Sequence, residues 1–572
     1  MMTKDERKQE SKTSDVDTII LNYRIDETPP WYLALFLGFQ HYLTMFGSTL
    51  AVPIIIAPAL CVTDDVVVGK LISTVFFVSG IATLLQTTFG NRLPIVQGIT
   101  FSYLVPTFAL LSQPKFQCPG LKDTNNTENS TSNSDEIWQI RMREVQGAIM
   151  VSSLFQILIG FTGLIGFLLR FIGPITVAPT IALVGLALFP VCSDYAAKHW
   201  GIAIITIAVI TICSQFLSRI KIPLPTYSRL KGFHTTGVAI FGLFPVVIAI
   251  IVSWIFCAIF TETDVFSATS KARTDSRSSV LSQSPWFRVP YPGQWGTPTI
   301  SLAGVFGMLA GVIAGVIESV GDYYACARLS GAPPPPPHAI NRGIGVEGVA
   351  CLLAGAIGTG NATTSFSENI GALGITKVGS RRVVQCGAIL MIILALFGKF
   401  GAFFSTIPDP VIGGIFCVMF GLITAVGISN LQFVDLNSVR NLFIIGFAIV
   451  MGLVIPDYLN KNAGVINTGV DELDQIFTVL LKTSMAVGGT IACLLDNLIP
   501  GTVEERGIKE WRKLTADRAT SNVASIHVYD LPFGIFNKSK FSKFIPFLPY
   551  YDDETEVFNM AERGSYSLEI PS

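Results

Sequence analysis

The sequence has little charge for its length. Only 14% of its 572 residues are charged, whereas 50% are hydrophobic, and the mean hydropathy is +0.55. A soluble protein of this size does not need so many apolar residues to fill its core, so the composition places the chain in a lipid bilayer. The net charge of −1 gives no electrostatic basis for binding nucleic acid.

Three further absences narrow the class of protein. The ten cysteines include no CxxC pair, so neither a zinc site nor a disulfide scaffold is indicated. Cys118 lies in a polar loop and is a candidate for oxidation, and the sequence leaves its disulfide state open. Residues 1–27 lack the apolar region of a cleavable signal peptide, so we expect the first membrane helix to act as the signal. With no supporting soluble domain, we predict no enzymatic activity and no cofactor.

Apolar stretches recur from Trp31 to Ile499. A helix needs about 20 apolar residues to cross a bilayer, and about fourteen segments approach this composition. The clear segments are Trp31–Leu60, Val145–Leu169, Phe171–Val191, Trp200–Leu217, Val238–Phe260, Ile300–Ala327, Val383–Phe397, Ile407–Ile428, Leu442–Pro456 and Phe477–Leu495. The weaker ones are Leu71–Phe89, Pro94–Leu111, Ile344–Ile357 and Asn361–Ile375. We therefore predict an all-α polytopic membrane protein.

Two segments are short, polar and interrupted by glycine where a lipid-facing helix should be apolar. They are VQGITFSYLVP (Val96–Pro106) and GTGNATTSFSENIGALGIT (Gly358–Thr376). Backbone that is not helical is tolerated at membrane depth only where it is buried in protein or lines a cavity. A pair of broken segments in two halves of a chain indicates the binding site of a transporter.

The two halves of the chain also resemble each other weakly. GPITVAPTIALVGLALF (Gly173–Phe189) is similar to PDPVIGGIFCVMFGLITA (Pro408–Ala425). If these are equivalent spans, the repeat contains about seven segments, and an odd number inverts the second repeat in the membrane. The alternative is that apolar helices rich in glycine and proline look alike by composition alone.

Charge predicts the topology. Arg219–Lys231 carries four basic residues and no acid, and Lys377–Arg382 carries three more, so both segments should be cytosolic. The loop 113–141 is then extracellular, which agrees with its glycosylation sequons at Asn125 and Asn129. An even number of spans places both termini in the cytosol. We expect the polar tail after Pro500 to be a flexible trafficking segment.

Two carboxylates lie inside the apolar segment Ile300–Ala327. Glu318 and Asp322 are its only charged residues, and their i,i+4 spacing puts both on one helix face. A carboxylate at the middle of a membrane helix costs about 2.5–3.5 kcal/mol, so this face should point into the bundle. The alternative is that both acids are hydrated near the helix end or paired with Arg328.

The second broken segment holds a third acid, Glu368. A half-helix starting after Glu368 would aim free N–H groups at the site, and glycines allow the backbone to approach a ligand closely. The surrounding polar residues are Thr363, Thr364, Ser365, Ser367 and Asn369. The sequon at Asn361 lies in the same segment, and we expect it to be embedded and unmodified.

Other polar or aromatic residues in the predicted spans support two interpretations each. Gln40 and His41 interrupt the first span, where a lone histidine is more often a hydrogen-bonded packing residue than a proton carrier. Phe101 could stack on a planar ring through its π-face, although an aromatic residue in a membrane helix usually serves packing.

At these residues the chain resembles the nucleobase–ascorbate transporter family. ENIGALGITK (Glu368–Lys377) matches the family signature, and Gln40 with His41 matches the pair in its first span. The stretch GDYYACARLSGAPPPPPHAINRG (Gly321–Gly343) is similar to the animal, sodium-coupled branch. Within that branch, the signature with Glu368 is most similar to a sodium-dependent nucleobase transporter. The resemblance extends over most of 31–500.

This resemblance implies fourteen spans in two inverted repeats, a homodimer in the plasma membrane and an elevator-type alternating-access cycle. It also implies a moving core domain (spans 1–4 and 8–11) and a gate domain. The corresponding ranges are 1–30 for the N-terminal tail, 31–170 and 299–400 for the core, 171–298 and 401–500 for the gate, and 501–572 for the C-terminal tail.

The resemblance further implies the roles of site residues. Substrate would contact Ser48, Phe101, Glu318, Ser367 and Glu368, while Asp322, with Ser102 and Asn369, would couple transport to Na⁺. Gln40 and His41 would support the site. A carboxylate at 322 suits a hard cation, which prefers oxygen ligands.

Substrate class depends on Glu368. Ascorbate carriers of the family have proline there, whereas nucleobase carriers have Glu or Gln, and a carboxylate accepts hydrogen bonds from ring N–H groups but repels anionic ascorbate. Much of the remaining sequence resembles the ascorbate carriers, so sodium-dependent ascorbate transport is the alternative. A channel is disfavoured because broken segments imply one closed site at the midplane. Preference for purine or pyrimidine and sodium stoichiometry stay open.

Overall fold

Helices account for nearly all of the structure. The computed structural model describes residues 21–116, 118, 130–228, 232–462, 464–509, 526–532 and 545–549. Within these ranges, nine helical segments are long and apolar enough to cross a membrane, and a tenth crossing is possible if a pair of helices bent by 82° counts as one. The prediction of a helical, multi-pass membrane protein is therefore confirmed.

The nine long segments have clear bounds. They are α2 (Trp31–Ala59), α3 (Asp65–Thr88), α5 (Ser130–Thr162), α7 with α8 (Pro174–Leu186 and Phe189–Ala196), α11 (Pro245–Glu262), α13 (Leu302–Ser330), α14 (Pro337–Ile357), α18 (Asp409–Ser429) and α19 (Val439–Lys461). The bent pair is α20 (Asp471–Lys482) and α21 (Ser484–Leu498).

The count of about fourteen spans stays a prediction. It is reached if each of the shorter described segments also crosses the bilayer. These are α9 with the π-helix η2 (Trp200–Thr211 and Ile212–Phe216), α16 with α17 (Arg381–Leu396 and Gly398–Ser405), and two segments in which a strand precedes a helix, β1–α4 and β4–α15. Short connecting helices complete the described part: α6 (Ile165–Phe171), α10 (Ile240–Leu243) and α12 (Ser278–Gln283).

The two segments predicted to be broken form a small antiparallel sheet with each other. β1 (Gln97–Ile99) pairs with β4 (Thr363–Ser365), with Gly98 opposite Thr364. All six residues are buried, so their backbone groups need partners inside the protein. Gly98 is required here because a Cβ would meet the Phe366 ring at 2.4 Å. The sheet thus joins two stretches of chain that are far apart in sequence.

A half-helix leaves each strand. α4 (Leu104–Leu111) follows β1 and leads to the turn at Phe116, whereas α15 (Ser367–Thr376) follows β4 and ends beside Asn22, whose N–H donates to the Lys377 carbonyl at 2.8 Å. The half-helices therefore run toward opposite ends of the bundle. This geometry is expected of two segments in inverted repeats, and the seven-span repeat itself stays a prediction.

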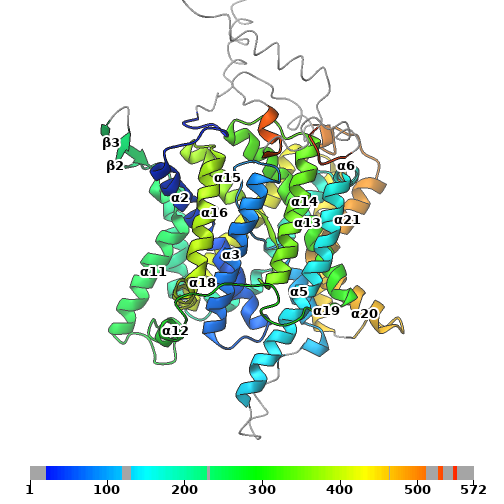
Figure 1. Cartoon of the computed structure of the whole chain (residues 1–572). Helices are drawn as coiled ribbons and strands as arrows, with labels where there is room; N and C mark the ends of the chain where they lie inside the picture. The colour runs from blue at the N-terminus through cyan, green and yellow to red at the C-terminus, as the bar shows by residue number, and fades with distance from the viewer. Residues whose placement is uncertain are drawn as a thin grey trace, which may run out of the picture.

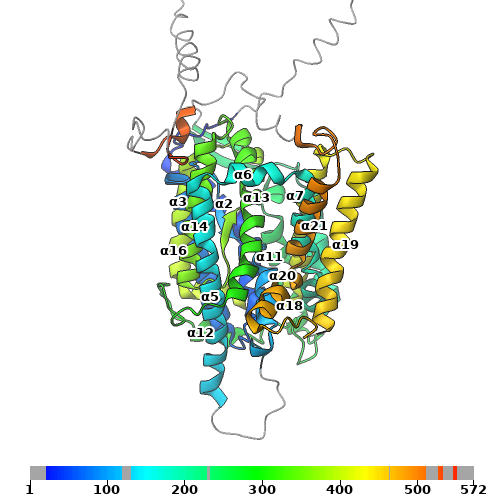
Figure 2. The same ribbon diagram turned by 90° about the vertical axis from the view of Figure 1, so that its right-hand side faces the viewer.

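The helices pack into two groups (Figures 1 and 2). In the first group, α3 packs against α16, α17 and α14, α2 against α16, and α13 against α5 and α15. In the second group, α7 packs against α18 and α21, α19 against α21, and α9 against α11 and α18. Figure 2 shows α3, α14 and α16 on one side of α13, and α19 and α21 on the other. Large apolar side chains exposed on both groups, such as Leu158 and Val450, suit contact with lipid.

The two ends of the bundle differ. At one end, Cys61 after α2 forms a disulfide with Cys118, which identifies the partner that the sequence left open. At the other end, Tyr23 pairs with Val378, close to the C-terminal segment described below. The described parts next to both termini therefore share one end, opposite the disulfide. Asn125 and Asn129 lie outside the described residues.

Two segments differ from the sequence prediction. A hairpin of β2 (Ile222–Ser228) and β3 (Gly232–Val238) occupies the basic segment for which no strand was predicted, and the following span starts at Pro245 and not at Val238. Isoleucine, threonine, tyrosine and valine favour strands, and these residues recur in the hairpin. α5 likewise begins at Ser130, inside the predicted loop 113–141, because its first turns are polar and carry no hydropathy signal.

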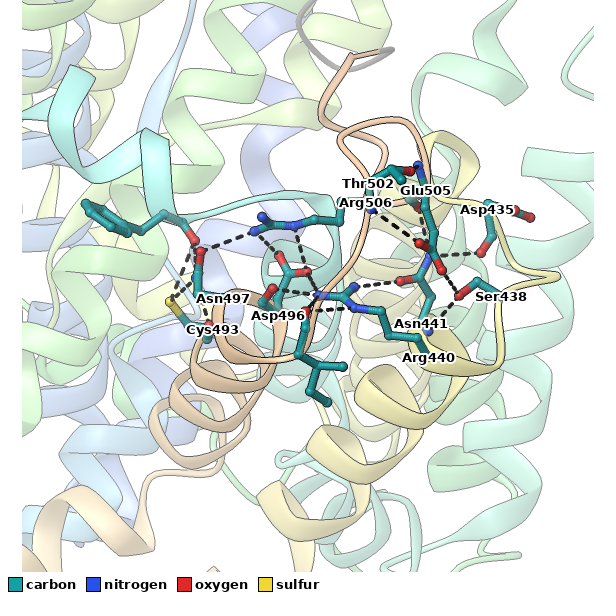
Figure 3. Close-up of polar contacts among 12 residues, drawn as sticks. Asp435, Ser438, Arg440, Asn441, Cys493, Asp496, Asn497, Thr502, Glu505 and Arg506 are labelled. Carbon is teal, nitrogen blue, oxygen red and sulfur yellow. Dashed lines mark hydrogen bonds and ion pairs between the residues drawn. The ribbon is translucent and has the colours of Figure 1, made fainter.

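The chain after Pro500 is anchored on the second helix group by a buried ion cluster (Figure 3), which we call the arginine cluster (Arg440, Asp496 and Arg506). The Asp496 side chain is fully buried and accepts from Arg440 at 3.0 Å and from Arg506 at 2.9 Å. Arg440 also donates to the Ile499 carbonyl, which satisfies the end of α21.

The sequence predicts a flexible trafficking segment after Pro500, whereas the described parts of this tail contact the helix bundle. Tyr529, at the end of the 3₁₀ turn η4 (Ile526–Tyr529), is fully buried, and its carbonyl accepts from Arg342 of α14. The Val528 carbonyl accepts from Arg381 of α16 at 3.0 Å. These arginines donate hydrogen bonds to the carbonyl groups at the end of η4. Hydropathy did not identify this packed segment because it contains few apolar residues.

Candidate functional site

Four carboxylates lie where the two groups of helices meet the strand pair. Glu318 and Asp322 are on α13, Glu347 is on α14 and Glu368 is in the first turn of α15. Among the residues that the structure describes, none of these four forms an ion pair with a lysine or an arginine. We call these four residues the acid site.

Asp322 is held by hydroxyl groups from the second broken segment. Its two carboxylate oxygens accept from Ser367 and from Ser365, both at 2.8 Å, and the residue is 7% exposed. The predicted face of α13 therefore points into the protein, against β4 and the start of α15. The alternative in which Asp322 pairs with Arg328 is not observed.

Glu347 is a member of the site that sequence reasoning missed. It accepts from Ser319 at 2.7 Å, from Gln156 at 3.0 Å and from Tyr323 at 3.3 Å, and it is 1% exposed. The available signal was a single acid inside the weak span Ile344–Ile357. Its neighbours come from α5 and α13, so neither their proximity nor their number could be predicted from the local sequence.

Hydrogen bonds join Glu347 to Asp322. The Ser365 hydroxyl contacts the Ser319 hydroxyl at 3.1 Å as well as Asp322, and Ser319 donates to Glu347. Thr364 of β4 contacts Ser319 at 2.9 Å. A buried polar network is favourable only when its members are satisfied, so this chain fixes β4 against α13 and α14.

Glu368 faces the first predicted span. The Ser48 hydroxyl of α2 donates to Glu368 Oε1 at 3.0 Å, which brings together two of the residues predicted to contact substrate. The sequence predicted a half-helix that starts after Glu368. In the structure α15 begins at Ser367, so Glu368 lies inside its first turn. An acid in the first turn is favourable because the helix dipole places partial positive charge there.

Glu318 and Phe101 complete the predicted substrate contacts. Glu318 is half-buried one helical turn before Asp322, and no described side chain donates a hydrogen bond to it. Phe101 is 8% exposed and meets Phe420 of α18 edge to face, with ring centroids 5.5 Å apart. Phe101 therefore lies where the first helix group contacts the second.

The remaining predicted residues, Gln40, His41, Ser102 and Asn369, form no hydrogen bond with the described acid-site carboxylates. Asn369 Nδ2 donates to the His41 carbonyl at 2.8 Å and lies 3.2 Å from His41 Nδ1, so His41 is hydrogen-bonded between α2 and α15. Gln40 is also buried beside it. The Ser102 hydroxyl donates no described hydrogen bond to Asp322, and the Ser102 N–H donates to the Thr100 hydroxyl at 3.1 Å. The structure thus does not bring Ser102 and Asn369 into hydrogen-bond contact with Asp322.

The electrostatics of the acid site explain what it can do. An uncompensated charge buried at membrane depth is costly, and polar residues there are usually paired or functional. Serine and threonine hydroxyls satisfy individual oxygens without cancelling the negative charge. The site is therefore suited to a cation, a proton or a ligand that offers hydrogen-bond donors, which are the properties of a membrane transporter with a site inside its helix bundle.

Comparison with known proteins identifies the family. Residues 33–461 match the model of a permease family. Solute carrier family 23 member 2 of Rattus norvegicus is 53% identical over 542 residues, which cover 92% of this chain and 82% of the relative. Member 1 of the same species is 52% identical, and its match covers 92% of this chain and 89% of the relative. Nucleobase-ascorbate transporter 1 of Arabidopsis thaliana is 35% identical over 90% of this chain and 96% of the relative.

The chain belongs to the nucleobase–ascorbate transporter family. It is a multi-pass membrane transporter and not an enzyme. Among solved structures, the transmembrane domain of a cyanobacterial bicarbonate transporter, BicA, aligns with 77% of this chain and 99% of its own, at 13% identity and a TM-score of 0.47.

Proposed function

We propose that this transporter is a sodium-coupled symporter that imports nucleobases through the acid site. The observation that carries the proposal is the pair Glu318 and Glu368, two half-buried carboxylates that pair with no lysine or arginine among the described residues. The substrate class comprises uracil, thymine, hypoxanthine, xanthine and guanine. The protein would act in the plasma membrane as a homodimer, with both termini in the cytosol.

The chemistry of a nucleobase edge fits these carboxylates. Uracil and the oxopurines present ring N–H donors, and a carboxylate accepts such bonds strongly because it is charged. Ser48 already holds one oxygen of Glu368, which leaves the other available for a ligand. Phe101 offers an aromatic ring next to the second helix group, against which a planar base can stack.

Sodium coupling is proposed for Asp322. Hard cations prefer oxygen ligands, and the Ser365 and Ser367 hydroxyls lie at Asp322. In the described part of the chain, no group of three His, Cys, Asp or Glu side chains could hold a metal ion, so the remaining ligands would be hydroxyl, carbonyl or water oxygens. A bound Na⁺ would offset the charge of Asp322 and favour the geometry that binds substrate.

The proposed cycle uses the two helix groups. The acid site is built almost entirely from the first group, whereas the second group supplies the surface that Phe101 meets. Movement of the first group along the second would carry the site from one membrane face to the other in an elevator-type alternating-access cycle. The first group corresponds to the predicted core domain and the second to the predicted gate domain.

Sodium-dependent ascorbate transport is the second candidate. Overall similarity favours it, because the sequence outside the signature resembles the ascorbate carriers of the animal branch, and solute carrier family 23 members match 92% of the chain. The family name covers both substrates. The acid site favours the nucleobase, since anionic ascorbate would be placed beside Glu318 and Glu368 without a compensating cation.

Uptake separates the candidates. Cells that express the chain should accumulate labelled uracil or hypoxanthine when sodium is present and lose that uptake when choline replaces sodium. Cells without the chain provide the background. Sodium-dependent uptake of labelled ascorbate with no nucleobase uptake would overturn the nucleobase proposal and establish the second candidate.

A further inference from the structure

A cluster of charges lies outside the acid site, at the end of the bundle that carries the disulfide. It borders a cavity of about 310 Å³ between α2, α3, α8 and α18. Asp409 at the start of α18 contacts Lys198 at 2.7 Å and Arg277 at 3.0 Å, and Arg277 also contacts Asp65 at 3.1 Å. We call Asp65, Arg277 and Asp409, with Lys198, the charge bridge.

The charge bridge connects the two helix groups. Asp65 is the first residue of α3, in the first group, whereas Lys198 follows α8 and Asp409 begins α18, both in the second group. A neighbouring contact crosses the same boundary, since the Tyr195 hydroxyl of α8 donates to the Ile54 carbonyl of α2 at 3.0 Å. The groups are therefore joined at this end by polar contacts as well as by packing.

Arg277 stands where the loop between α11 and α13 passes from one group to the other. Before it, Phe266 packs edge to face on His199, next to α9 in the second group. After it, the Arg288 N–H donates to the Leu396 carbonyl of α16 at 2.9 Å, and Trp295 donates to the Gly358 carbonyl after α14 at 2.8 Å. Relative movement of the groups must act on the loop at Arg277.

Two glycines beside the acid site border open space while the charge bridge is formed. Gly321, beside Asp322, and Gly371, one turn after Glu368, are exposed, and a Cβ built on either would meet nothing within 4 Å. From Glu368, α15 continues to Lys377, at the end of the bundle that holds the described residues next to the termini. The open space thus lies toward that end, away from the charge bridge.

We propose that the charge bridge is the outer latch of the transport cycle. It holds the two helix groups together while the site faces the cytosol, and it must separate before solute can enter from outside. The proposal rests on the two-body cycle proposed above and not on the identity of the substrate. The Asp409 side chain is only 6% exposed, so its ion pairs are screened less than surface pairs.

A thiol reporter behind the latch tests this proposal. Ile412 of α18 lines the cavity and is 3% exposed, so Ile412→Cys should react slowly with a membrane-impermeant methanethiosulfonate reagent added outside intact cells. Arg277→Gln in the Ile412→Cys background should raise the labelling rate about threefold or more, because removing the bridge shifts the population toward the outward-open state. The chain without Ile412→Cys gives the background from native cysteines.

Arg273→Gln is the matched control. Arg273 lies in the same loop, but its ion pairs with Asp264 and Asp275 stay within that loop. It should leave labelling unchanged. Asp65→Asn is the second test variant, because it weakens the ion pair between Arg277 and the first group and leaves Arg277 bound to Asp409. It should raise labelling in the same direction even if Arg277→Gln does not reach the surface.

Two results would overturn the latch. One is labelling at the unchanged rate in surface-expressed Asp65→Asn and Arg277→Gln; the other is an equal increase in Arg273→Gln. Failure of the nucleobase proposal is distinguishable, since it would appear as absent nucleobase uptake with the labelling difference intact.

Discussion

The acid site and the arginine cluster are both buried and both contain carboxylates, yet their charges are arranged differently. In the arginine cluster, Asp496 lies between two guanidinium groups within 3.0 Å (Figure 3). In the acid site, Asp322 and Glu347 receive only hydroxyl and amide hydrogen bonds. The buried carboxylate of the arginine cluster is paired with cationic side chains, whereas those of the acid site have no such partner in the described part of the chain.

This difference separates a structural role from a functional one. The arginine cluster stabilises the position of α19, α21 and the chain after Pro500, because its buried carboxylate is paired with two arginines of the protein. An uncompensated site is costly to maintain in a membrane, and intramembrane acids of this kind mark ion and substrate pathways. Mutations in the two clusters should therefore affect different measurements.

The largest expected effect is on transport, from Asp322→Asn. The substitution keeps the size of the side chain and one of the two oxygens that accept from Ser365 and Ser367, but it removes the charge proposed to hold Na⁺. Sodium-driven uptake should be abolished or lose its dependence on sodium, with surface expression retained. Full uptake with the wild-type sodium dependence would show that Asp322 does not couple the ion.

Asp496→Asn should instead affect stability. Removing one partner of a buried ion pair costs about 3–5 kcal/mol, because the other partner is left uncompensated, and here two arginines remain. We expect a strong decrease in thermal stability of detergent-solubilised protein, measured by fluorescence-detected size-exclusion after heating. Uptake per surviving surface molecule should stay near the wild-type value.

The matched control for that prediction is Asp457→Asn. Asp457 pairs with Lys461 in an exposed i,i+4 contact, and such pairs contribute about 0.3–0.5 kcal/mol. The thermal stability of the Asp457→Asn protein should hardly change. Equal stability losses in the two variants would remove the distinction between a buried cluster and a surface pair.

Glu368→Pro should have a smaller, substrate-specific effect. A charge-assisted hydrogen bond contributes about 1.5–3 kcal/mol, and each 1.4 kcal/mol corresponds to a factor of ten in affinity. Nucleobase uptake should fall by roughly tenfold or more, while Glu368→Gln, which keeps one acceptor oxygen, should lose less. A gain of ascorbate uptake in Glu368→Pro is expected to be weak. Unchanged nucleobase uptake in Glu368→Pro would place the substrate elsewhere.

The smallest expected effect on transport comes from removing the predicted glycosylation sites, which test the membrane orientation of both clusters. Replacing Asn125 and Asn129 by Gln should remove glycans from the loop 113–141 and increase the mobility of the mature band on a gel, with uptake per surface molecule unchanged. An unchanged band would contradict glycosylation. Labelling of this loop only after permeabilisation would contradict the predicted orientation of both clusters.

Hydropathy was sufficient to predict part of the acid site. Glu318, Asp322 and Glu368 interrupt apolar segments, so the cost of their burial was visible in the sequence, and the structure places Glu368 with Ser48 and Asp322 with Ser367. Glu347 was missed because one acid in a weak span gives no local sign that Gln156 and Tyr323 approach it from other helices.

Long-range pairings were beyond sequence reasoning for a similar reason. The strands β1 and β4 are three residues long, too short to show an alternating pattern, and they pair with each other across more than 260 positions. The tail after Pro500 looked unstructured because its anchors, Arg342 and Arg381, lie in the helix bundle. Composition identified the polytopic fold, whereas contacts between distant segments decided its details.

The strand pair also sets a problem for biosynthesis. Asn361, beside β4, donates to the Thr100 carbonyl beside β1, and these residues are 261 positions apart. At about 5–20 residues per second, the ribosome needs roughly 13–50 s to synthesise the intervening chain. During that interval the edge of β1 lacks its partner, in a membrane that offers no water to satisfy it. The first half of the protein must therefore be sheltered during synthesis, by the insertion machinery or by lipid-facing helices, until its own second half arrives.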